Sequence, residues 1–403
     1  MNSHRILKTC IVIIIPLICA VFYTFLPRNW DALLSSRAYY FITVSEHVST
    51  VNEIDFTVNR DRDLLFTPLL HRFPFFLSRL PENYSLIIPG ILCAAISIGL
   101  FAYIRLQTGD GVLIAALLSF LFGLSNSHMT YAGIPGSIEP AGLLVMITIS
   151  FWILWVGSCN PLSMVFLLIS MAALGLQSPI TLILFSFGYM ISEWIHMGTW
   201  RGLFPALGIS ILTILIAVGV RAQYLSVAGG ETSHVEFLKR SFEYILSQGD
   251  ISRLVSWNHI VTVLLNTSVT AIIGVPVQSF SDAPVCAAYC APMDILKGYT
   301  MHTPALLALA PFVYLFLMSI ARGGYFGRFG VLLLTYMVAH GLFFIFFDPR
   351  YSIPYSPQII GPFLLIFGDS LEGIERYKKV PLLILFVLLT CVANTMIHIK
   401  LAY

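Results

Sequence analysis

Long apolar stretches dominate the chain, and short polar stretches separate them. Because a transmembrane helix needs about 20 mainly apolar residues, the pattern predicts a bundle of about eleven membrane-spanning helices. The predicted spans are 11–25, 86–103, 112–124, 142–155, 164–176, 180–195, 203–220, 304–320, 330–347, 359–368 and 380–397. We therefore expect an all-α, polytopic transmembrane fold in one domain, residues 1–403, with no separate soluble domain.

Composition agrees with this fold class. Hydrophobic residues make up 58% of the chain and charged residues 10%, whereas a soluble domain is about 25% charged. The formal net charge of +2 shows no strong excess of either sign. Nucleic acid is therefore not an expected partner.

Basic residues beside the spans predict the orientation of the chain. They are Arg5, Lys8, Arg105, Arg201, Arg322, Arg328, Arg376, Lys378 and Lys379. Under the positive-inside rule they mark cytoplasmic segments, with the N-terminus in the cytoplasm and the C-terminus outside. This topology requires that segment 259–275, which contains Asn266 and Thr267, does not cross, so we expect it to be re-entrant or interfacial.

The topology leaves two external regions, 27–85 with amphipathic helices and 221–302 with the re-entrant or interfacial segment. In the second region, Cys286 and Cys290 lie four residues apart. They form either a disulfide on an oxidising side of the membrane or two free thiols. Zinc is not expected, because no second Cys or His pair stands at ligand spacing.

The first external region is the predicted place for chemistry, because charged groups are costly at membrane depth. Glu53 and Asp55 form either a pair that holds a divalent cation or a solvated pair. Arg60 and Arg62 either bind phosphate or pair with the neighbouring acids. Outside this region, Glu139 starts a span and either lines a cavity or caps the helix.

The order of several short motifs resembles the GT-C superfamily of membrane glycosyltransferases, which includes the protein mannosyltransferases and the lipid A aminoarabinose transferase. The matching features are Asp31 after the first span, Tyr39 or Tyr40, Pro68 with Leu69, the small-residue turn 173–179 with Gln177 or Ser178, and Arg350 with Tyr351 before a late span. Ala32 and Thr67 depart from the pattern, at positions where relatives carry a second acid and a proline.

The resemblance implies an inverting glycosyltransferase that takes a sugar from a polyprenyl-phosphate donor. Asp31 would be the general base, or else a helix cap. Arg350 would bind the donor phosphate together with Tyr351, Arg60 and Arg62, or else extend to the lipid headgroups or pair with Asp348. The alternative for Tyr351 is packing at the membrane interface, where aromatic side chains collect. No cofactor is implied with certainty, and a divalent cation stays a candidate.

The expected partners are the lipid-linked sugar donor, membrane lipids and a lipid, glycan or protein acceptor on the outer or luminal face. A lipid-linked glycan transporter or flippase and a non-catalytic scaffold are the alternatives. The bacterial inner membrane of the cell envelope is favoured. Glycosylation sequons at Asn83 and Asn266 keep the endoplasmic reticulum as a second location.

Overall fold

The computed structural model describes residues 2–26, 82–109, 111–133, 138–227, 239, 243, 245–247, 249–274, 292–321, 327–347, 352, 355–371 and 374–402. Within these ranges the chain is almost wholly helical and contains no strand. The prediction of an all-α fold is confirmed.

Seven helices of the described part are long and apolar enough to cross a membrane. They are α1 (Asn2–Phe25), α5 (Glu82–Gln107), α8 (Ile138–Ser158), α10 (Pro179–Met197), α11 (Trp200–Val227), α16 (Arg328–Phe347) and α18 (Arg376–Ala402). Four helices at other predicted spans are not among these seven: α6 (Val112–Gly123), α9 (Pro161–Gln177), α15 (Thr303–Ala321) and α17 (Pro357–Ser370). The chain is therefore an integral membrane protein by its helices, and the count of about eleven spans stays a prediction.

Helix ends coincide with local capping signals. The side chain of Asn160 accepts a hydrogen bond from the Leu162 amide at 2.9 Å, and Pro161 follows at the first position of α9. Both features favour a helix start. Helix α10 ends at Gly198, whose φ of 62° suits a residue without a side chain. These turns let neighbouring apolar helices pack side by side.

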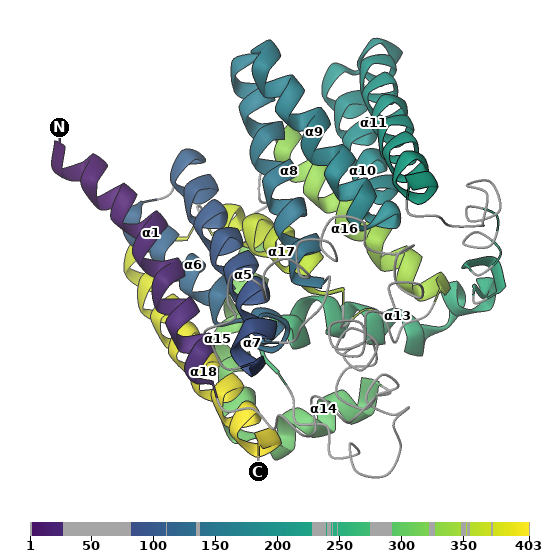
Figure 1. The fold of residues 1–403 in the computed structure, drawn as a ribbon. Coiled ribbons are helices and arrows are strands. Elements are labelled where there is room, and N and C mark those ends of the chain that lie inside the picture. Colours follow the sequence, from purple (N-terminus) through teal and green to yellow (C-terminus); the bar gives the residue numbers. More distant parts are fainter. Residues whose placement is uncertain are drawn as a thin grey trace.

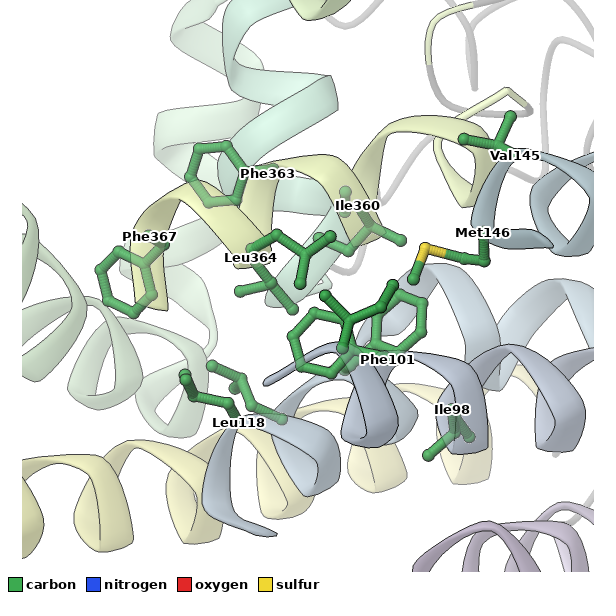
Figure 2. Close-up of a cluster of buried hydrophobic side chains, with 14 of the residues drawn as sticks. Ile98, Phe101, Leu118, Val145, Met146, Ile360, Phe363, Leu364 and Phe367 are labelled. Carbon is green, nitrogen blue, oxygen red and sulfur yellow. The ribbon is translucent and has the colours of Figure 1, made fainter. Parts of the chain in front are cut away.

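Helix α17 lies in the middle of the bundle, between the group around α1, α5, α6 and α18 and the group around α8 to α11 and α16 (Figure 1). Figure 2 shows its Ile360 and Leu364 facing side chains of α5, α6 and α8. Its Phe363 and Phe367 point to the other side, where both rings lie near Phe312 of α15. A side chain at Gly361 would come within 2.5 Å of the Met146 sulfur. The core therefore forms around this short helix, which is too short to meet the length criterion of a span.

Large apolar side chains also cover much of the outer surface. Examples are Ile211 and Leu215 of α11 and Leu17 of α1, each about half exposed or more. A soluble protein rarely exposes such wide apolar patches. In a bilayer these side chains contact lipid.

Short helices gather at one end of the bundle, the lower end in Figure 1, where the C-terminus also lies. They are α7 (Asn126–Tyr131), η1 (Ile251–Val255), α13 (Trp257–Leu264), the π-helix η2 (Leu265–Thr270) and α14 (Pro292–Met301). The predicted re-entrant or interfacial segment, 259–275, falls largely in α13 and η2, which pack against α16, α14 and α17. The choice between its two arrangements stays a prediction.

Candidate functional site

Glu139 is the predicted site residue that the structure describes. The others lie outside the described residues: Asp31, Glu53, Asp55, Arg60, Arg62, Cys286, Cys290, Arg350 and Tyr351. The site is therefore built from Glu139 and from the helices to which the other segments are joined.

Glu139 lies in the first turn of α8 and is buried. Both of its carboxylate oxygens lie 3.0 Å from Nδ1 of His128, whose side chain is also buried. The Phe122 ring meets the imidazole edge-to-face, with 4.3 Å between ring centres. The carboxylate is thus held by a histidine that the sequence analysis did not single out.

The turn between α6 and α7 places His128 opposite Glu139. Ser125 is the N-cap of α7: its hydroxyl accepts a hydrogen bond from the His128 amide at 3.4 Å and donates one to the Phe122 carbonyl at 2.7 Å. An N-cap serine fixes where a helix starts. The imidazole is therefore turned back toward the start of α8.

Further buried polar side chains extend from this pair. Ser127 of α7 lies 2.8 Å from Ser356, hydroxyl to hydroxyl. Asn126 donates to the Thr270 carbonyl at 3.1 Å. Asn266 of the π-helix donates to the Ser352 hydroxyl at 3.0 Å. We call the set Asn126, Ser127, His128, Glu139, Asn266, Ser352 and Ser356 the polar seam, because it joins α7, α8, η2 and the chain that leads into α17.

A second group of hydrogen bonds fixes the chain next to the polar seam. Asn394 of α18 donates to the carbonyls of Leu124 and Ile272, each at 2.8 Å, and accepts from the Gly274 amide at 2.7 Å. Tyr299 of α14 donates to the Ile273 carbonyl at 2.7 Å, and burial raises the pKa of its hydroxyl, so it stays protonated. The neighbouring backbone is therefore tied to the last helix.

The ends of several helices meet around the polar seam. The Tyr23 hydroxyl, near the end of α1, donates to the Gly123 carbonyl at the end of α6. A Cβ at Gly90 of α5 would lie 2.9 Å from the Ala132 carbonyl, and one at Gly142 of α8 would lie 2.8 Å from the Pro357 carbonyl. Segments 27–81, 134–137 and 348–351 join the chain at this end of the bundle.

The small-residue turn between α9 and α10 also contacts α17. The Ser178 and Thr181 hydroxyls lie 2.6 Å apart, and Thr181 donates to the Gln358 side chain at 2.7 Å. Tyr336 of α16 donates to the Gln358 carbonyl at 3.3 Å. The small-residue turn 173–179 is thus linked to the start of α17, next to Pro357.

Two ion pairs lie near the opposite end. Arg105 is fully buried and donates to the Leu365 carbonyl at 3.0 Å and to Asp369. Arg328 binds both carboxylate oxygens of Glu193. Both arginines were expected to mark cytoplasmic segments. The structure places them in terminal turns of helices, where each has a carboxylate partner.

The described residues contain neither a candidate metal site nor a disulfide. No group of three or more His, Cys, Asp or Glu side chains that could hold a metal ion occurs within them. The cysteines that the structure describes are free: Cys10, Cys19, Cys93, Cys159 and Cys391. The predicted cation pair and the predicted disulfide lie outside the described ranges.

No known protein-family model matches the chain, and no curated protein is significantly similar to it.

Proposed function

We propose that this chain is a membrane glycosyltransferase of the GT-C type. It transfers a sugar from a polyprenyl-phosphate donor to a lipid, glycan or protein acceptor on the outer or luminal face of the membrane. One observation carries the proposal: the buried His128–Glu139 pair lies at the end of the helical bundle where the segments with Asp31 and Arg350 are joined.

Ionisable side chains inside a membrane protein are costly and usually serve function. A structural role alone would be met at lower cost by apolar packing, because replacing a buried ion pair with apolar residues is often neutral or stabilising. His128 and Glu139 lie buried beside serine and asparagine side chains in the polar seam. This concentration of buried polar groups supports a reaction centre at this end.

In the proposed reaction, the hydroxyl or amine of the acceptor attacks the anomeric carbon of the donor sugar. The bond from that carbon to the phosphate oxygen breaks, and the electron pair leaves with the lipid phosphate, so the configuration inverts. Asp31 takes the proton of the acceptor. Arg350, with Tyr351, Arg60 and Arg62, stabilises the departing phosphate.

We further propose that α6, α9, α15 and α17 cross the membrane together with the seven helices named above, which makes eleven crossings. An odd number places the two termini on opposite sides, and they lie at opposite ends of the bundle in Figure 1. With the N-terminus in the cytoplasm, the polar seam faces outward. The bacterial inner membrane fits such a transferase, which uses lipid-linked donors outside the cytoplasm.

The test is transfer of radiolabelled sugar from a panel of polyprenyl-phosphate donors by the purified protein. Asp31→Asn is compared with Glu243→Gln, which changes an exposed acid. We expect transfer by the wild type and by Glu243→Gln, and a loss of about 100-fold or more in Asp31→Asn, the scale of a general base. Equal activity of the two variants removes Asp31 as the base. No transfer from any donor contradicts the proposal and favours a transporter or a scaffold.

A further inference from the structure

Residues 251–264 expose large apolar side chains although they lie outside the seven long spans. Ile251 is 74% exposed, Val255 84% and Trp257 74%, and Leu264 is also mostly exposed. The segment comprises η1 and α13. Such a set of exposed apolar side chains on two short helices is typical of a surface that contacts a membrane or another protein.

The other side of this segment is fixed to α16. The Asp250 amide donates to the Phe346 carbonyl at 2.9 Å, and Arg253 donates to the Phe347 carbonyl. Val263 is fully buried against Phe344 and Ile345. The segment therefore sits at the last turn of α16, a helix that is long and apolar enough to cross a membrane.

The exposed side of α16 continues toward this segment. Leu334, Val338 and Leu342 follow one another at four-residue spacing and are each well exposed, so they form one stripe along the helix. Leu342 stands one turn before Phe346, which accepts the hydrogen bond from Asp250. The apolar surface of η1 and α13 thus adjoins the lipid-facing surface of a span.

We propose that residues 251–264 form an interfacial anchor that lies in the membrane surface, with Ile251, Val255 and Trp257 inserted among the lipids. Tryptophan concentrates at this depth, and short amphipathic helices bury their apolar side in the boundary between headgroups and acyl chains. The partner of this surface is the lipid leaflet into which α16 ends. This inference does not depend on the proposed transferase activity.

The first test is the rate at which a membrane-impermeant maleimide modifies a cysteine at position 255 or at position 243. Val255→Cys is set against Glu243→Cys, whose native side chain is charged and 61% exposed. The protein is kept in opened native membranes, so that both faces are accessible, and mass spectrometry locates the label. We expect the rate of reaction at position 255 to be about one tenth of the rate at position 243 or lower, because lipid covers position 255.

The slower reaction must disappear once the protein is denatured in sodium dodecyl sulfate. Equal rates at positions 255 and 243 in native membranes overturn the proposal. Trp257→Cys provides a second variant, since it tests the same surface if Val255→Cys does not fold. Elution of each variant like the wild type on size-exclusion chromatography shows that the fold is kept.

The second test separates lipid from a protein partner. A nitrobenzoxadiazole dye is attached at position 255 or 243, and the protein is reconstituted with doxyl-labelled lipids. The dye at position 255 is expected to be quenched several-fold more than the dye at position 243. Slow maleimide reaction without quenching means that another protein covers the surface, and it overturns the proposal.

Discussion

The Nδ1 atom of His128 lies 3.0 Å from both carboxylate oxygens of Glu139, and both side chains are buried. The pair joins α7 to the first turn of α8. The second ring nitrogen, Nε2, has no hydrogen-bonding partner in the described part of the chain. An unsatisfied buried polar atom costs about 1–3 kcal/mol, so the position of this ring lowers the free energy of unfolding.

Removing the imidazole is expected to destabilise the protein strongly. His128→Ala leaves the Glu139 carboxylate buried without its donor, and breaking a buried pair in this way costs about 3–5 kcal/mol. Glu139→Gln keeps an acceptor oxygen for Nδ1 and should cost less. The measurement is the temperature at which half of the detergent-purified protein remains monodisperse. Lys239→Ala serves as the control, since its pair with Glu243 is exposed and worth about 0–1 kcal/mol; equal effects of His128→Ala and Lys239→Ala contradict this account.

Two glycines of α8 provide a matched pair for testing how α8 and α17 pack. At Gly142 a Cβ would lie 2.8 Å from the Pro357 carbonyl, whereas at Gly157 it would meet nothing within 4 Å. Gly142→Ala must push the start of α17 away from α8, and overpacking of this kind costs about 1–3 kcal/mol. Gly157→Ala should be neutral or stabilise by up to about 1 kcal/mol. Thermal stability and sugar transfer are compared for both, and a larger loss in Gly157→Ala would show that this packing is wrong.

The buried ion pair near the other end should matter more than an exposed one. Asp369→Asn leaves the fully buried guanidinium of Arg105 without its carboxylate. We expect a loss of about 3 kcal/mol, the lower end of the range for such pairs, because Asp369 is itself partly exposed. The control is Lys378→Gln, which removes an exposed pair with Glu375. The same thermal assay is used, and a stability of Asp369→Asn no lower than that of Lys378→Gln would argue against the observed pairing.

Cys159 reports the orientation of the bundle. It is exposed in the turn between α8 and α9. The end of α5 lies next to that turn, because Tyr103 and Gln107 of α5 line the same pocket as Ser158 of α8. The proposed topology places this end in the cytoplasm. An impermeant maleimide added to intact cells should leave Cys159 unmodified and should modify it in inverted vesicles, with mass spectrometry locating the label. Modification in intact cells would place the polar seam on the cytoplasmic side and contradict the proposed outward-facing site.

Much of the helical framework could be predicted from the apolar runs. Predicted span 112–124 corresponds to α6, and span 330–347 to α16. Within lipid, a helix satisfies its backbone hydrogen bonds internally, so an apolar run long enough to span the bilayer is expected to be helical. Helix α11 extends past its predicted end at residue 220 to Val227, because backbone hydrogen bonding continues into the polar residues that an apolar count excludes.

The site was less predictable, because its contacts join residues that a hydropathy pattern does not relate. Glu139 was a candidate, but its partner His128 was missed, since residues 125–130 were read as a connection and not as the helix α7. His128 and Glu139 both lie in the short stretch between predicted spans 112–124 and 142–155. Two ionisable residues so placed could have indicated the pair. Arg105 was expected to mark a cytoplasmic segment after span 86–103. Its ion pair could not be predicted, because its partner, Asp369, stands 264 positions later.

The most direct test of the central claim is whether Asp31 and Arg350 meet at the polar seam. Asp31→Cys and Arg350→Cys are combined, and the protein in native membranes is treated with a thiol cross-linker about 11 Å long, or two helical turns. Mass spectrometry identifies the products, with the native Cys159 near the opposite end as the internal control. We expect a cross-link between positions 31 and 350 and none between position 31 and Cys159. Failure of positions 31 and 350 to cross-link, while each reacts with a monofunctional maleimide, would contradict it.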